Sequence, residues 1–310
     1  MTSPYTDLNR PPLNAAVLRR ALCAPRGPIS RLDIVESTGS TNVDAADGLA
    51  AEPGAWPDLS VVVAEHQSAG TGRRGRQWSS PARSGIYSSI VLRPNLDAVN
   101  PWPAGSFGWL PLLGGLAACE AIADVGELAT SVKWPNDVLV ETADGDRKVA
   151  GVLARAVLLG QEQAVVLGAG INVTLNREEL PHPAATSVQL AGAVVYDRDS
   201  LLRAYLRRVV HWYSALKGSG GDAEASGLAG AVRGRTSTLG AEVRVELPGE
   251  RSLTGAAARI DSQARLVVRH GSQETSVSAG DVVHVRRAGA ASPAPEEETA
   301  GRARTEDEES

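Results

Sequence analysis

Cysteine and histidine are scarce in this 310-residue sequence, which holds two cysteines and five histidines. Cys23 and Cys119 lie far apart in apolar surroundings, so neither a disulfide nor a zinc site is expected, and both are predicted to be small buried residues. The histidines show no spacing typical of metal ligands. The sequence therefore points away from a disulfide framework and predicts no metal-ligating side chain.

Uninterrupted apolar runs are also short. No unbroken span of nineteen apolar residues occurs, and residues 1–12 are polar and proline-containing, without the apolar stretch of a signal peptide. We therefore expect neither secretion nor membrane insertion, and the cytosol is the expected compartment.

The charge balance excludes a large nucleic-acid-binding surface. The net charge is −5, and the stretch from Ser292 onward, with seven acidic residues against two arginines, carries all of it. The remainder is close to neutral, which does not favour a polyanion as general partner. The Ala/Pro/Glu-rich tail lacks apolar residues, and we expect residues 288–310 to be a disordered acidic extension.

The most distinctive stretch is a loop that follows the apolar run Val61–Ala64. Three glycines and three arginines fall within positions 70–76. Glycines let backbone N–H groups turn toward an anion, and arginines supply bidentate donors for phosphate or carboxylate. The stretch predicts a binding loop for a small polyanion.

Two other interpretations of this loop exist. Gly70, Gly72 and Gly75 match the dinucleotide-binding pattern, but that pattern requires a helix to open at the loop, and residues 77–81 (QWSSP) are not helical in character. A solvated basic turn is a second alternative, and the loop alone does not decide against it.

Hydrophobic periodicity and turn residues divide the chain into four parts. Helices are predicted over residues 13–23, 43–50, 107–125 and 199–217. Strands are predicted over 29–36, 61–64, 86–92, 132–140 with a break at 134–137 (WPND), 147–153 and 164–169. The helix over 107–125 is nearly all apolar, so we expect it to be core. Five short alternating segments between 242 and 286 predict a small barrel. The expected parts are an N-terminal segment (1–28), a catalytic domain (29–228), the barrel (229–287) and the tail (288–310).

Further polar clusters stand at the ends of predicted strands. Residues 37–42 (STGSTN) form a hydroxyl-rich turn, where one side chain is expected to cap the following helix and the others are free to bind. Lys133, Asn136 and Asp137 share one hairpin, and these residue types suit substrate anchoring and metal or phosphate handling. Residues 168–172 (GAGIN) permit close approach of a ligand to the backbone.

In their order along the chain, these motifs closely resemble those of biotin protein ligases. They are residues 40–42 (STN), the loop 67–78, residues 133–137 (KWPND), residues 147–153 (RKVAGVL) and residues 168–172. The resemblance runs from about residue 29 to 287. It implies an α+β fold, in which a mixed β-sheet is flanked by helices and followed by an SH3-like barrel. It also implies a ligase that uses ATP and Mg²⁺ to form biotinyl-5′-adenylate and then modifies a lysine of a biotin carboxyl carrier domain.

The resemblance also implies roles for individual residues, carried over position by position. The implied biotin-binding set is Ser40, Thr41, Asn42, Gln67, Gly70, Thr71, Gly72, Arg73, Lys148 and Gly151. The implied ATP and adenylate contacts are Arg74, Arg76, Trp78, Lys133, Asn136 and Asn172. Lys148, Arg73 and Asp137 are the implied catalytic residues, with Lys148 at the carboxyl end of biotin.

The chain departs from the family pattern at Thr71, where many relatives have arginine. Either the backbone at this position holds the ligand and the side chain is dispensable, or Arg73 and Arg74 supply more of the positive charge. Family members that also act as repressors carry an N-terminal winged helix. Because one short helix precedes residue 29, we expect no such domain, no DNA partner and a monomer or weak homodimer.

The chemistry of the implied reaction agrees with these residue types. A carboxylate that attacks a phosphate brings two anions together, which requires cations and fixed geometry. Arg73, Arg76, Lys148 and a Mg²⁺ ion would meet that need without a covalent enzyme nucleophile. The glycines of the loop suit a lid that excludes water from a hydrolysable intermediate. The alternatives left open are a lipoate or octanoate ligase and a biotin-responsive regulator.

Overall fold

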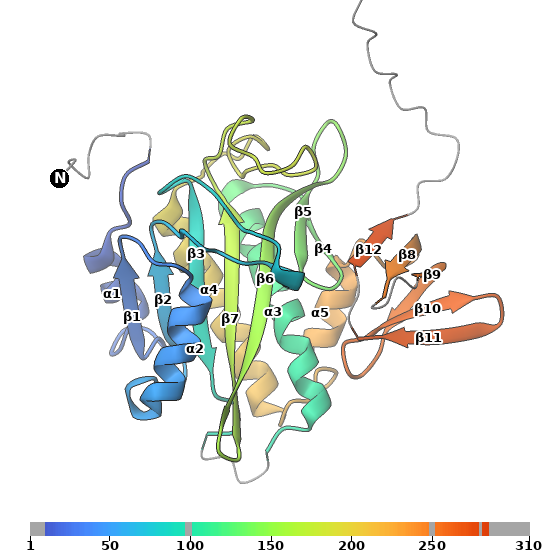
Figure 1. Cartoon of the computed structure of the whole chain (residues 1–310), viewed down its shortest axis with the longest axis horizontal. Coiled ribbons are helices and arrows are strands. Elements are labelled where there is room, and N and C mark those ends of the chain that lie inside the picture. Colours follow the sequence, from blue (N-terminus) through green and yellow to red (C-terminus); the bar gives the residue numbers. More distant parts are fainter. Residues whose placement is uncertain (1–9, 97–100, 248–251, 279–280, 285–310) are drawn as a thin grey trace, which may run out of the picture.

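The computed structural model describes residues 10–96, 101–247, 252–278 and 281–284 (Figure 1). The predicted acidic tail and the predicted end of the last strand at Arg286 lie outside these residues.

A seven-stranded mixed sheet forms the centre of the molecule, with the order β1-β2-β3-β7-β6-β5-β4. β1 and β2 are parallel, and the other neighbours are antiparallel. The strands are β1 (Arg31–Val35), β2 (Ser60–Ala64), β3 (Gly85–Leu92), β4 (Thr130–Lys133), β5 (Asp137–Val140), β6 (Arg147–Leu159) and β7 (Glu162–Asn172). The strand predicted over 132–140 with a break at 134–137 is a tight hairpin of β4 and β5, because residues 134–136 turn the chain back.

Helices cover both faces of this sheet, because its strands bury side chains on both sides. Val62 of β2 packs with Ala45 and Leu49 of α2 (Thr41–Ala51) on one face. Val61 and Val63 point to the other face, with the core formed by α3 (Trp109–Gly126) and α4 (Arg198–Gly218). Figure 1 shows α2 in front of the sheet and α4 behind it. The expected mixed sheet flanked by helices is confirmed.

The apolar helix predicted over 107–125 is α3, which a short 3-10 turn, η3 (Ala104–Gly108), precedes. Judged by length and composition alone, residues 104–126 could cross a membrane, since an 18-residue stretch within them has a mean hydropathy of 1.3. However, 72% of that stretch is buried inside the protein. The helix is therefore core, as the sequence predicted.

The helix starts differ in how they are capped. Asn14 Oδ1 accepts from Val17 N at the start of α1 (Ala15–Leu22), and Asp197 accepts from Ser200 N at the start of α4. The expected side-chain cap at the start of α2 is not seen. Ser40 holds the N-cap position without a side-chain hydrogen bond, and its carbonyl accepts from Val43 N instead. Its hydroxyl is therefore not used for capping.

The C-terminal part begins with α5 (Leu228–Arg235) and continues as a second sheet. Its order is β11-β10-β9-β8-β12, with every pair antiparallel. The strands are β8 (Glu242–Glu246), β9 (Ser252–Ile260), β10 (Leu266–His270), β11 (Gln273–Val277) and β12 (Asp281–His284). Trp109 and Trp134 of the larger part donate indole N–H groups to the carbonyls of Ser262 and Ala264. These bonds tie the second sheet to α3 and to the β4–β5 turn.

Candidate functional site

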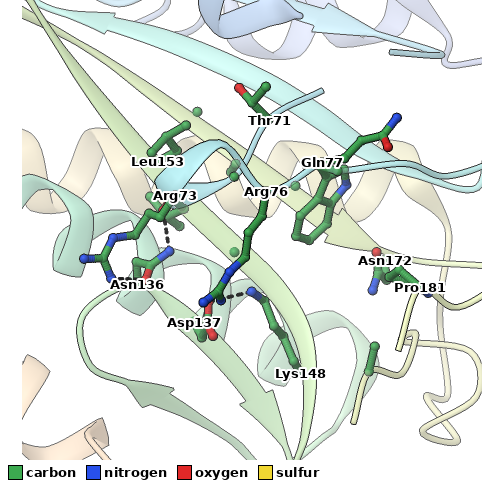
Figure 2. A pocket seen from close by; sticks show the side chains of 18 of the residues that line it. Thr71, Arg73, Arg76, Gln77, Asn136, Asp137, Lys148, Leu153, Asn172 and Pro181 are labelled. Carbon is green, nitrogen blue, oxygen red and sulfur yellow. Dashed lines mark hydrogen bonds and ion pairs between the residues drawn. The ribbon is translucent and has the colours of Figure 1, made fainter. Parts of the chain in front are cut away.

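One large pocket of about 1040 Å³ opens on the α2 side of the central sheet. Its walls come from the start of α2, the loop between β2 and β3, strands β3 to β7, and residues 181–185. Five sequence motifs that are far apart along the chain therefore meet in one cavity. Figure 2 shows side chains of this loop and of β5, β6 and β7 gathered around it.

A buried polar network forms one end of the pocket. Gln67 Oε1 accepts from Thr41 N at 2.8 Å and from Thr41 Oγ1 at 3.1 Å. Thr41 Oγ1 lies 2.8 Å from Ser89 Oγ, which donates to Asn42 Oδ1 at 3.2 Å. Asn42 Nδ2 in turn donates to the carbonyl of Leu153 at 3.1 Å. This network fixes side chains from α2, the loop and β3 against one another.

Two glycines of β7 create the space for these side chains. A Cβ atom at Gly168 would lie 2.6 Å from Asn42 Nδ2, and one at Gly170 would lie 2.7 Å from the ring of Trp78. Real Cβ atoms do not approach that closely, so both positions require the bare backbone of glycine. The sequence predicted that a ligand approaches the backbone of residues 168–172 closely. In the structure, the side chains of Asn42 and Trp78 approach it.

Trp78 forms the middle of the pocket wall. Its ring is 3.3 Å from the position that a Cβ atom would take at Gly151, and Lys148 Nζ lies 5.7 Å from its centroid, within cation–π range. Within the described ranges, its indole Nε1 is buried and has no hydrogen-bond partner. Because an unpaired buried donor costs free energy, this N–H is a candidate contact for an acceptor on a ligand.

Charged side chains gather at the other end of the pocket. Lys148 Nζ of β6 lies 2.7 Å from Asp137 Oδ1 of β5, and both side chains are about one third exposed. Arg73 Nη1 donates to Asn136 Oδ1 at 3.2 Å, and Asn136 Nδ2 donates to the carbonyl of Val152. In Figure 2, Arg76 extends from the loop toward the Lys148–Asp137 pair. The loop thus brings its arginines over the β4–β5 hairpin.

The loop itself contains a single 3-10 turn, η2 (Arg73–Gly75), and no α-helix opens there. This agrees with the sequence argument against a dinucleotide-binding turn. Arg74 adopts a left-handed backbone with φ of 56°, and its guanidinium donates to the carbonyl of Glu246 in β8 at 2.9 Å. The loop is therefore tied to the second sheet as well as to the hairpin.

Most of the residues that the sequence singled out lie in this pocket. Those in its lining are Ser40, Thr41, Asn42, Gln67, Thr71, Gly72, Arg73, Arg76, Trp78, Lys133, Asn136, Asp137, Lys148, Gly151 and Asn172. Within the described chain, Gly70 and Arg74 do not belong to the lining. Gly70 instead packs against the backbone of Trp78 and the amide of Gln67, and Arg74 turns toward β8.

The sequence analysis assigned no role to five polar residues of the lining, namely Gln77, Ser88, Ser89, Asp146 and His182. Ser89 lies in the middle of an apolar strand, and nothing in its neighbourhood distinguishes it from a core serine. His182 belongs to a loop that pairs with β6, since Lys148 N donates to Ala184 O and Thr186 N donates to Lys148 O. Only the fold brings that loop to the pocket.

The donor set suits anions. Arg73, Arg76, Lys133 and Lys148 line the pocket together with two carboxylates, Asp137 and Asp146. Across the described ranges, no group of three or more His, Cys, Asp or Glu side chains is placed to hold a metal ion. Two carboxylates fit Mg²⁺ only in the way that Mg²⁺ binds beside nucleotide phosphates, where the substrate supplies the other ligands. The pocket can thus place a carboxylate and a phosphate side by side.

Comparison with known proteins agrees with this geometry. A model of the Biotin/lipoate A/B protein ligase family matches residues 38–172, which span α2, strands β2 to β7, the loop and the pocket glycines. The biotin–[acetyl-CoA-carboxylase] ligase of Mycobacterium tuberculosis is 40% identical over 287 residues, which cover 90% of this chain and 98% of that protein. The bifunctional ligase/repressor BirA of Escherichia coli is 31% identical over 59% of this chain and 52% of its own length.

A solved structure extends the likeness to three dimensions. The biotin protein ligase from Aquifex aeolicus in complex with biotin and ATP superposes with a TM-score of 0.62 and 25% identity, over 83% of this chain and all of that chain. The relative from Mycobacterium tuberculosis is matched over nearly its whole length, at an identity high enough to establish common descent. This chain belongs to the family of biotin protein ligases.

Proposed function

We propose that this protein activates biotin with ATP and transfers it to a lysine of a biotin carboxyl carrier domain. The observation that carries the proposal is the arrangement of one pocket, which has a neutral, hydrogen-bonded polar network at one end and four cationic side chains at the other. Such a pocket suits a ligand with a neutral polar head and a carboxylate tail. Membership in the ligase family and the named relatives support the same ligand.

The first step joins two anions. An oxygen of the biotin carboxylate attacks the α-phosphorus of ATP, the bond from that phosphorus to the bridging oxygen breaks, and pyrophosphate leaves. Lys148 holds the carboxylate, while Arg73 and Arg76 lie over the phosphates and offset the charge that builds up. Mg²⁺, when bound with ATP, supplies further neutralisation near Asp137. Asn136 positions Arg73 through the hydrogen bond between them.

The second step uses a neutral amine of the carrier. The amine nitrogen attacks the carbonyl of biotinyl-adenylate, AMP leaves, and the nitrogen loses a proton to give the amide. No side chain of this chain becomes acylated. The residues of the loop exclude water while the adenylate is bound, because water would hydrolyse the mixed anhydride.

We assign the residue roles from the resemblance to the family, and the presence of these residues in one pocket supports the assignment. Ser40, Thr41, Asn42, Gln67, Thr71, Gly72 and Gly151 surround the biotin head and tail, and Trp78, Lys133, Asn136 and Asn172 meet the adenylate. We assign Gly70 and Arg74 to the shape of the loop. The five antiparallel strands β8 to β12 support an SH3-like domain, joined by α5 to a catalytic domain that ends near residue 228.

Exchange of labelled pyrophosphate into ATP tests the first step without any carrier. We expect exchange that depends on biotin and Mg²⁺ and that lipoate or octanoate does not support. Exchange with lipoate, and none with biotin, would assign the chain to the other branch of the matched family. Absence of exchange with every acid, from protein that binds ATP, would contradict the activation step.

A further inference from the structure

Ser89 lies at the centre of the polar network, although nothing in the sequence marks it. It is fully buried on β3, where it pairs with Val62 of β2 and Gly168 of β7. Val62 packs on α2, so the side chain of Ser89 faces α2 and the pocket. Its hydroxyl lies between Thr41 and Asn42 and contacts both.

The direction of each hydrogen bond in this network follows from its last acceptor, the carbonyl of Leu153. The Leu153 carbonyl accepts, so the atom of Asn42 that meets it is the amide nitrogen, and Asn42 Oδ1 faces Ser89. Ser89 has a single hydroxyl proton and donates it to Asn42 Oδ1. At 2.8 Å from Thr41 Oγ1, Ser89 Oγ must then accept the proton of Thr41, which it shares with the more distant Gln67 Oε1 at 3.1 Å. The proton of Thr41 is thus committed to the protein.

This arrangement fixes what the pocket offers to a ligand. With its proton committed, Thr41 Oγ1 can only accept a further hydrogen bond. Gln67 Oε1 already accepts from Thr41 N, which leaves the Gln67 Nε2 group as donor. An acceptor beside a donor complements a cyclic urea, which carries N–H groups beside a carbonyl. A dithiolane or alkyl chain offers neither group.

We propose that Ser89 is a positioning residue that sets the Thr41 hydroxyl as an acceptor and thereby selects the ureido ring of biotin over acids without N–H groups. This inference rests on the proposed function and names the residue behind its specificity. A site built to hydrogen-bond a substrate rejects an analogue that lacks the partner, because a buried polar group is left unpaired.

The test compares Ser89→Ala with a matched control on the neighbouring strand. Ser60 of β2 is also fully buried, and its hydroxyl donates to the carbonyl of Pro57 at 2.7 Å. Within the described ranges, Ser60 does not belong to the pocket lining. Calorimetric titration with biotin should show about tenfold weaker binding for Ser89→Ala. Ser60→Ala should stay within about twofold of wild type in biotin affinity.

A second readout separates positioning from general loss of packing. Biotin analogues methylated at one or the other ureido nitrogen lack one donor each. The wild type should prefer biotin over at least one of them strongly, and in Ser89→Ala that preference should shrink about tenfold, since the partner hydroxyl is no longer held as an acceptor. A purely structural defect would weaken both ligands equally and leave the ratio unchanged, which would overturn the proposal.

Gly168→Ala supplies an independent variant should Ser89→Ala fold poorly. A Cβ atom there would lie 2.6 Å from Asn42 Nδ2 and displace the amide that orients Ser89. The same shrinkage of the biotin preference is expected, and an unchanged ratio would again contradict the inference. A wild-type protein that does not bind biotin would refute the proposed function itself, whereas wild-type binding with an unchanged ratio in both variants refutes only the role of Ser89.

Discussion

Lys148 Nζ lies 2.7 Å from Asp137 Oδ1, so the lysine assigned to the biotin carboxylate already has a carboxylate partner. The two residues come from neighbouring strands, β6 and β5, and the side chain of Trp78 lies beside them. A ligand carboxylate must therefore share or replace Asp137 as the partner of this lysine. Because the pair is partly solvated, its own contribution to folding stability is small.

Replacing Lys148 by alanine should weaken biotin binding without unfolding the protein. The variant loses a charge-assisted contact to a carboxylate, worth about 1.5–3 kcal/mol, or roughly 10- to 100-fold in Kd. Lys217→Ala is a matched control, since Lys217 is 38% exposed and forms a 2.7 Å pair with Asp58, which is not part of the pocket lining. Titration calorimetry on both variants decides the matter, and equal affinities would remove Lys148 from the biotin site.

Arg73→Gly should release the adenylate rather than prevent its formation. Arg73 links the loop to the hairpin through Asn136, while Arg76 and Lys148 remain in the pocket. Adenylate should dissociate faster, and a non-carrier protein such as albumin should then become labelled. A double-mutant cycle of Arg73→Ala and Asn136→Ala should show coupling in the adenylate off-rate. Additive effects would show that the hydrogen bond between them does not hold the loop.

Arg74→Ala should behave differently from its neighbour. The Arg74 guanidinium donates to the Glu246 carbonyl of β8 and lies outside the pocket lining. We expect the biotin-dependent pyrophosphate exchange to stay within about threefold of wild type, with a loss of stability of about 1 kcal/mol. A drop of more than tenfold in exchange, with thermal unfolding unchanged, would return Arg74 to the adenylate contacts.

Much of the fold was predictable because it rests on local patterns. The amphipathic periodicity of α4 and the apolar length of α3 predicted both helices to within about two residues. The break at residues 134–137 was predicted, but the reversal of the chain there was not, because the apolar stretches on either side resemble one interrupted strand. The closure of β8 to β12 into a barrel stays a prediction, since they form one open sheet order in the described residues.

The site was predictable where the chemistry is carried by charge and glycine, and not where it depends on tertiary contact. The arginines and glycines of the loop stand out in any sequence. Ser89 does not, because the role of a serine in an apolar strand depends on its neighbours across the sheet, which the sequence does not show. The direction of the Arg74 side chain was not predictable either, since it depends on the left-handed turn and on β8.

A buried ion pair far from the pocket predicts an acid limit to stability. Arg93 forms a bidentate pair with Glu162 at 2.8 Å and also donates to the carbonyls of Pro53 and Trp56. The hydrogen bonds from Arg93 lower the pKa of Glu162 below its usual value of 4.5. A lowered pKa in the folded state means that the stabilisation is complete above pH 4.5 and is lost as the pH falls through the folded pKa.

Denaturant titrations between pH 3 and 7 should therefore show this loss in the wild type. Glu162→Gln should be less stable at neutral pH by about 1.5–3 kcal/mol, with a flatter acid limb. Glu274→Gln, which alters an exposed pair with Arg259, should retain the wild-type slope. An acid limb that is equally steep in Glu162→Gln and wild type would show that another group sets it.

The most direct test of the account is the intact mass of a biotin carboxyl carrier domain after incubation with the purified protein, biotin, ATP and Mg²⁺. We predict one biotinyl group per carrier, at one lysine, with no product when ATP is omitted, when lipoate replaces biotin, or when that lysine is changed to arginine. A carrier that gains lipoyl instead of biotinyl groups, or that stays unmodified while the protein binds both biotin and ATP, would contradict it.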